Sequence, residues 1–238
     1  MQEPTSDGKA AAREPVFFLP TIIVAAMALC AGLYALEAYV LPERMDAQFL
    51  SLMAFVPARF DTMSASCVFE FVRTAVTCSL LHASPAHLAV NMIWLAAFGA
   101  PLAQRLGIWR FAAFWVFAAF CSTALHFLTH LGDPSPLVGA SGVVSGAMGA
   151  AARFGFAASG GSGARAFTGA PLTFSEALRS RSVISFVLVW AAVNFISGSG
   201  AIDMGQGSAS IAWEAHVGGF LAGLLGLRLF DRQAARRA

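Results

Sequence analysis

Charged side chains are scarce in this 238-residue chain. They make up 12% of the residues, whereas hydrophobic side chains make up 58%. A soluble globular domain carries about 25% charged residues. One soluble core of this length cannot bury so much apolar surface, so the composition argues against a soluble domain and predicts a membrane protein.

Two binding signatures are also missing. The formal net charge is only +2, and the chain has no long basic run and no aromatic–basic interleaving, so nucleic acid is not an expected partner. The cysteines at positions 30, 67, 78 and 121 form no CxxC pair, which argues against a structural zinc site and a thioredoxin-type site. Spacing alone leaves open whether Cys67 and Cys78 form a disulfide.

The sequence instead contains several long apolar runs. A membrane-spanning helix needs about 20 mostly apolar residues. Six candidates predict an all-α, polytopic six-helix bundle: Val16–Leu41, Pro85–Ala103, Ile108–Leu131, Ser141–Phe156, Val183–Ile196 and Ile211–Phe230. The bundle is expected over residues 16–231, between tails at 1–15 and 232–238. The first apolar run is too long for a signal-peptide core, so it is expected to be a retained span.

The basic residues predict the orientation of this bundle. With the N-terminus inside and six crossings, twelve Lys and Arg fall on the inner side and only Arg44, Arg59 and Arg73 on the outer side. Both termini are therefore expected in the cytoplasm. Because eukaryotic targeting signals are absent, a bacterial inner membrane is the expected location.

Two connections differ from short turns. The outer stretch 42–81 mixes charged and apolar residues, which predicts a partly amphipathic element on the outer leaflet rather than a seventh span. The inner stretch 157–181 is rich in Gly, Ser and Ala and is expected to be a flexible linker.

The fourth span is too short for the bilayer. Its sixteen residues cover roughly 24 Å, less than the ~30 Å hydrocarbon core. With Arg153 at the inner surface, the helix begins below the outer surface, and the preceding segment 134–140 is irregular at membrane depth. Such backbone is tolerated only where it is buried in protein or lines a wet cavity. Ser141 is therefore expected to begin a helix inside a water-accessible pocket.

Ser141 lies within the tetrapeptide Gly139-Ala140-Ser141-Gly142. Free N–H groups at a helix start, together with the helix dipole, can stabilise an oxyanion beside a serine nucleophile. The alternative is that Ser141 only caps the helix. The tetrapeptide alone leaves both interpretations open.

His216 lies in the sixth span at about the depth expected for Ser141. An ionisable residue within the membrane predicts a functional site. Spans four and six each carry a GxxxG pair, and small residues at this spacing let two membrane helices approach closely. The pairs are Gly142 with Gly146 and Gly219 with Gly223. Close packing would bring the Ser141 hydroxyl within reach of His216. Alternatively, the glycines serve packing alone and His216 bonds a backbone carbonyl.

A third polar group begins the second span. His87 and Asn91 are four residues apart, so they share one helix face, and both side chains can donate hydrogen bonds to an oxyanion. The alternative is a metal site made by His82, His87 and His216. No carboxylate or thiolate is spaced to complete it, so neither a metal nor another cofactor is expected.

The strings GASG at the start of span four, AHxxG in the last span and HxxxxHxxxN before span two resemble the rhomboid protease family. This resemblance implies a six-span core and a Ser–His dyad, with Ser141 as nucleophile and His216 as general base. It also implies an oxyanion hole made by His87, Asn91 and the Ser141 backbone N–H. The implied activity is serine endopeptidase cleavage in or near transmembrane segments, with single-span or other membrane proteins as substrates.

The sequence departs from the family pattern at two points. Many members carry an aromatic residue one turn after the nucleophile, where Ser145 stands here, and a Trp-Arg pair in the first outer loop, where this chain has Val72-Arg73. His126 and His130, four residues apart in span three, have no family counterpart and are interpreted as a polar face without a function.

Two other functions remain as alternatives. The first is an inactive rhomboid-like protein that binds membrane clients, although such relatives usually lack the Ser or the His. The second is a small transporter with a broken helix, which would show inverted-repeat symmetry between its halves. The sequence has none.

Overall fold

The computed structural model describes residues 19–60, 65–156, 169–199 and 212–232. These residues are nearly all helical and include no β-strand, which confirms the all-α class. In chain order the elements are α1 (Thr21–Tyr39), α2 (Glu43–Met53), η1 (Pro57–Phe60), α3 (Ala65–Thr77), η2 (Cys78–Leu80), α4 (Pro85–Trp94), η3 (Leu95–Gly99), α5 (Ala100–Leu106), α6 (Ile108–Thr129), α7 (Ser141–Phe154), α8 (Phe174–Arg179), α9 (Arg181–Gly198) and α10 (Trp213–Phe230).

The helices coincide with the predicted spans to within a few residues. Within the described part of the chain, four segments are long and apolar enough to cross a membrane: α1, the continuous run Pro85–Leu106, α6 and α9. The run Pro85–Leu106 contains the π-helical turn η3, which joins α4 to α5. Helices α7 and α10 match the fourth and sixth predicted spans in position, at 14 and 18 residues. The polytopic membrane bundle is thus confirmed, while the count of six spans stays a prediction.

The inner linker was predicted too long. Its second half forms α8, which begins at a capping box between Thr173 and Glu176, and α9 then starts after its own cap at Ser180. The flexible-linker prediction is therefore wrong for residues 173–181, because capping residues within this polar stretch start two helices. Residues 157–168 lie outside the described part of the chain, as do both predicted tails except for Arg232.

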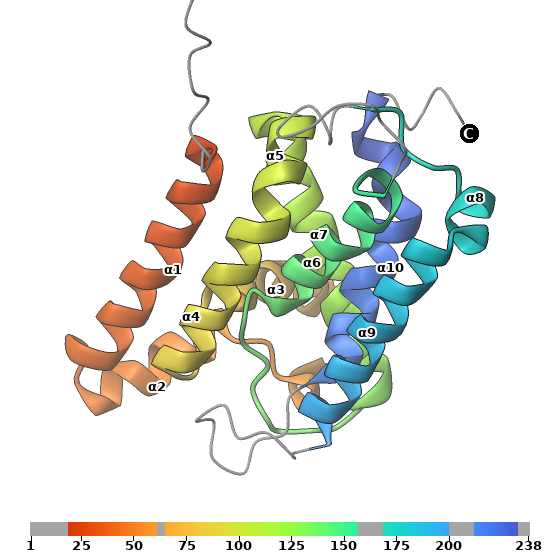
Figure 1. Ribbon diagram of the computed structural model, residues 1–238. Coiled ribbons are helices and arrows are strands. Elements are labelled where there is room, and N and C mark those ends of the chain that lie inside the picture. Colours follow the sequence, from red (N-terminus) through yellow and green to blue (C-terminus); the bar gives the residue numbers. More distant parts are fainter. Residues whose placement is uncertain (1–18, 61–64, 157–168, 200–211, 233–238) are drawn as a thin grey trace, which may run out of the picture.

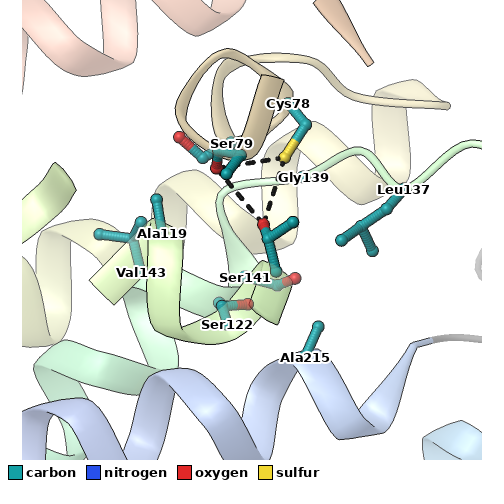
Figure 2. A pocket seen from close by; sticks show the side chains of 12 residues that line it. Cys78, Ser79, Ala119, Ser122, Leu137, Gly139, Ser141, Val143 and Ala215 are labelled. Carbon is teal, nitrogen blue, oxygen red and sulfur yellow. Dashed lines mark hydrogen bonds between the residues drawn. The ribbon is translucent and has the colours of Figure 1, made fainter. Parts of the chain in front are cut away.

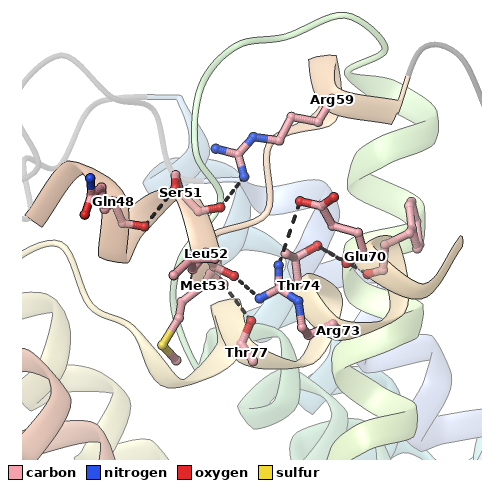
Figure 3. Close-up of polar contacts among 10 residues, drawn as sticks. Gln48, Ser51, Leu52, Met53, Arg59, Glu70, Arg73, Thr74 and Thr77 are labelled. Atoms are coloured by element: carbon pink, nitrogen blue, oxygen red, sulfur yellow. Dashed lines mark hydrogen bonds and ion pairs between the residues drawn. The ribbon is translucent and has the colours of Figure 1, made fainter. Parts of the chain in front are cut away.

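The outer loop contains two helices, α2 and α3, rather than one amphipathic element. Side chains of α3 and η1 hold the last carbonyls of α2: Arg73 donates to Leu52 O, Thr77 Oγ1 to Met53 O at 2.7 Å, and Arg59 to Ser51 O (Figure 3). These carbonyls have no partner within their own helix. Arg73 thus connects α3 to the end of α2 without the Trp that precedes it in many family members.

Helix α10 packs most extensively on α7 and then on α6 (Figure 1). A Cβ atom on Gly219 would overlap the carbonyl oxygen of Gly142, and one on Gly223 would overlap that of Gly146. In lipid, where burying apolar side chains gives no driving force between helices, small residues allow such close van der Waals contact. The predicted close packing of the two GxxxG pairs is confirmed.

A buried ion pair links the end of α5 to the end of α10. Arg105 Nε lies 2.6 Å from Asp231 Oδ2, and both side chains are almost fully buried. The guanidinium also stands over the ring of Phe154, and Arg153 donates to Leu172 O at 2.9 Å. These contacts gather the ends of α5, α7 and α10 at the upper end of the molecule in Figure 1.

Candidate active site

Ser141 is the first residue of α7. Ala140 occupies the N-cap position, and no side chain caps this helix. The hydroxyl of Ser141 therefore does not serve as the helix cap, which was the alternative interpretation. Ser141 is partly exposed, whereas the following residues of α7 through Phe154 are buried.

The segment before α7 is held by backbone hydrogen bonds to the outer loop. Leu137 and Phe55 exchange two N–H···O bonds of 2.7 and 3.3 Å, and Gly139 N–H donates to Cys78 O at 2.9 Å. Gly139 has a φ of +132°, and a Cβ there would lie 2.9 Å from two ring atoms of His87 and 3.5 Å from Ser141 Oγ. Glycine is thus required by both backbone and space, since a side chain here would meet both the His87 ring and Ser141 Oγ.

His87 lies in the first turn of α4. Ser84 caps this helix by accepting from His87 N–H at 3.1 Å, and Pro85 occupies the first turn, a pattern that favours helix initiation. Ala83 N–H donates to His87 Nδ1 at 3.5 Å. Since a nitrogen that accepts carries no proton, this contact assigns the proton of the neutral ring to Nε2, the nitrogen nearest Gly139.

Asn91 lies one turn further along α4 and is buried. Its Nδ2 donates one hydrogen to His87 O at 3.0 Å. An amide nitrogen carries two hydrogens, so a second one is left for another acceptor. His87 and Asn91 thus share a helix face as predicted.

A small recess lies beside Ser141 (Figure 2). Ser141, Ser122 and Ala215 line it from α7, α6 and α10, and Cys78 and Ser79 line it from η2. Cys78 remains a thiol, with its Sγ 3.7 Å from Thr123 Oγ1, so no disulfide links it to Cys67. The hydroxyl groups around Ser141 make this recess polar inside an apolar bundle.

His216 lies in the first turn of α10, next to Ala215 in the wall of the recess. Its Nδ1 is 2.6 Å from Asn194 Oδ1. Because an amide oxygen only accepts, Nδ1 carries the proton, and Nε2 of the neutral ring has a free lone pair. Asn194 Nδ2 donates to Trp213 O at 3.2 Å, which fixes the amide orientation.

The sequence alone did not identify Asn194 as a candidate site residue. It is 7% exposed, on a helix whose other side chains are mostly apolar and exposed. One turn earlier on α9, Trp190 stacks on Phe220 with ring centroids 4.2 Å apart. An amide within an apolar span is a signal for a functional partner, but the sequence does not say which helix it faces.

The histidines weighed for a metal site do not form one. His82 packs edge-to-face on His87 with ring centroids 5.3 Å apart, but His82, His87 and His216 do not bring three ligand atoms together. The described residues do contain another histidine group that approaches ligand spacing, at His126, His130 and Glu214.

Comparison with known families matches residues 70–232 to the Rhomboid domain. The match covers more than half of the chain, and the chain belongs to the rhomboid family. It is an integral membrane protein of a family whose members are typically intramembrane serine proteases. A comparison with curated proteins found no match.

Proposed function

We propose that this chain is an intramembrane serine endopeptidase in which Ser141 is the nucleophile and His216 the general base. The observation that carries the proposal is the contact between Gly142 on α7 and Gly219 on α10. Ser141 directly precedes Gly142, and His216 lies one turn before Gly219. The backbones of these two helices touch at the level of both groups.

The hydrogen bonds of His216 suit a general base. With Nδ1–H held by Asn194, Nε2 accepts the proton of Ser141 Oγ while Oγ attacks the scissile carbonyl carbon. The C–N bond then breaks, and the imidazolium returns the proton to the leaving amine. Water, deprotonated by the same nitrogen, hydrolyses the acyl-serine ester and restores the hydroxyl.

The negative charge on the carbonyl oxygen needs donors in place before the reaction. The backbone N–H of Ser141 is unpaired within its helix because it is in the first turn. His87 Nε2–H and the second hydrogen of the Asn91 amide supply two more donors. Together these three groups form the proposed oxyanion hole.

Asn194 acts as a positioning residue for His216. Many rhomboid proteases carry an aromatic residue where this chain has Ser145, which is buried. In this chain the imidazole is instead held from α9 by an amide. A hydrogen bond to the imidazolium that forms during the reaction stabilises the charged ring, as the third member of a catalytic triad does.

The proposed substrates are single-span or other transmembrane proteins, and the bilayer is the medium. Exposed apolar side chains cover the outward surfaces of α1, α6 and α9, as expected for contact with lipid. The proposed topology has six spans with both termini in the cytoplasm of a bacterium, since basic residues are concentrated where α5, α7 and α10 end.

The test is cleavage of a panel of single-span substrates in liposomes, together with labelling by a fluorophosphonate. Ser141→Ala and His216→Ala should each lower cleavage by about 10⁴-fold or more, because the dyad acts as a unit. Ser145→Ala, which removes a buried serine hydroxyl one turn along the same helix, should keep both cleavage and labelling.

Two results would overturn the proposal. Cleavage that survives in Ser141→Ala excludes this nucleophile. A folded wild-type protein that neither reacts with the fluorophosphonate nor cuts any substrate supports a family member that binds membrane clients without hydrolysing them.

A further inference from the structure

A second polar cluster lies close to the proposed dyad but takes no part in it. The ligand atoms of His126, His130 and Glu214 all lie within 4.8 Å of one another. The two histidines come from the end of α6, and Glu214 comes from the first turn of α10, two residues before His216. Far-separated parts of the chain thus bring two imidazoles and a carboxylate to one point.

The buried side chain of His126 has a ring nitrogen without a hydrogen-bond partner. The residue is only 7% exposed, and its Nδ1 is buried without a hydrogen bond. A polar atom buried in this way costs free energy unless it is paired. Its ring stacks on that of His130 with centroids 4.2 Å apart, which brings the two imidazoles to one side of the helix end.

His130 is already oriented in the manner of a metal ligand. Its Nδ1 lies 3.2 Å from His126 O and 2.9 Å from Thr129 Oγ1. Because a carbonyl oxygen only accepts, Nδ1 donates and Nε2 keeps its lone pair. Histidines that bind metals usually donate their other ring N–H to a carbonyl or carboxylate in this way.

The local charge also suits a divalent cation. Glu214 supplies one carboxylate, and Asp133, on the loop after α6, lies within electrostatic range of both histidines. Ser135 N–H donates to Asp133 Oδ1 at 2.8 Å and fixes the position of this carboxyl group. A carboxylate and two imidazoles therefore meet at one point, a donor set that suits a divalent cation.

We propose that His126, His130 and Glu214 bind one first-row divalent metal ion, with Zn²⁺ the best match to these donors. Imidazole and carboxylate together suit Zn²⁺ better than Mg²⁺ or Ca²⁺, which prefer oxygen ligands. Three protein ligands leave a fourth position for water. Ligands at about 2.0–2.2 Å from the ion require the cluster to contract, which the partly exposed His130 and Glu214 can accommodate.

Binding would clamp the end of α6 to the first turn of α10. Glu214 is two residues from His216, so the ion would fix the part of α10 that carries the proposed base. The proposed metal site is distinct from the dyad. None of its three ligands is assigned as nucleophile, base or oxyanion-hole residue.

The test uses the full chain without a histidine tag, in detergent, with Ser141→Ala to prevent self-cleavage. After chelation, the protein is titrated with Zn²⁺ by calorimetry and with Co²⁺ by visible absorption. We expect one ion per chain and a tetrahedral or five-coordinate Co²⁺ spectrum. Glu214→Gln and His130→Gln, which nearly conserve shape, should each weaken Zn²⁺ binding by more than about tenfold.

His82→Ala is the matched control, because it removes one ring of the other histidine pair, which packs edge-to-face, and it should leave Zn²⁺ affinity unchanged. No binding by the folded wild type would overturn the proposal. So would binding that survives in both Glu214→Gln and His130→Gln, or that is lost in His82→Ala or His216→Ala instead. These readouts need no peptide hydrolysis, so they stand apart from the test of the protease.

Discussion

Helix α10 meets its two neighbours α7 and α9 by different means. Against α7 the contact is between backbones, since Gly219 and Gly223 leave no space for a Cβ beside the carbonyls of Gly142 and Gly146. Against α9 the contact is between side chains, through the Asn194–His216 hydrogen bond and the stack of Trp190 on Phe220. The first contact sets where α10 lies, and the second sets how the imidazole is turned.

The two contacts should therefore tolerate change differently. A backbone contact has no rotamers to adjust, so an added methyl group must displace a helix. A side-chain contact can lose one partner and leave the helices in place. Changes at α7 should therefore affect folding and activity together, whereas changes at α9 should affect mainly activity.

The largest effect is expected for Gly219→Val. The added side chain would overlap the backbone of Gly142, so α7 and α10 cannot pack, and both Ser141 labelling and the cooperative unfolding transition in detergent should be lost. Gly32→Val on α1 is the control, because nothing lies within 4 Å of a Cβ there. Native unfolding and labelling in Gly219→Val would refute the backbone contact.

A smaller effect, confined to catalysis, is expected for Asn194→Ala. The variant removes a hydrogen bond to a group that becomes charged, which contributes about 1.5–3 kcal/mol, so kcat should fall about 10- to 100-fold. KM should change little, because Asn194 contacts His216 and Trp213 rather than the proposed substrate position. Val193→Ala, at an exposed neighbour, is the control. An unchanged kcat in Asn194→Ala would show that the amide does not position the base.

The smallest effect is expected for Trp190→Leu. Aromatic stacking contributes about 0.5–1.5 kcal/mol beyond buried area, so losing the stack on Phe220 should lower kcat by about two- to tenfold. The double variant with Asn194→Ala should show a non-additive loss, because both residues hold the same stretch of α10. Full additivity in kcat would mean that the two α9 contacts act on α10 independently.

Much of the architecture could be predicted from local sequence. The helical segments follow from apolar run length, and the start of α4 follows from Ser84 and Pro85. Comparing a sixteen-residue run with the thickness of the bilayer predicts that α7 begins below the outer surface, and this depth stays a prediction. The linker was the main error, since the capping box at Thr173 was hidden in a stretch that composition suggested was flexible.

Partners across the bundle could not be predicted in this way. A helix that is apolar on all sides carries no stripe to indicate which face meets which neighbour. Asn194 is 22 residues from His216, and the sequence between them gives no register for the contact. The approach of Glu214 to His126 and His130 could not be predicted either, because it depends on how α6 and α10 pack.

The sequence by itself determined that this is a helical membrane protein of the rhomboid family, and it indicated Ser141, His216, His87 and Asn91 as the residues to test. Those conclusions rest on features that are local in the sequence: the length of apolar runs, the spacing of small residues and the polar residues that interrupt apolar runs. Only the tertiary structure decided that Asn194 holds the imidazole and that His126, His130 and Glu214 share one point. The reason is that hydrogen bonds and metal ligation depend on side-chain geometry across helices, which helix packing fixes and chain order does not.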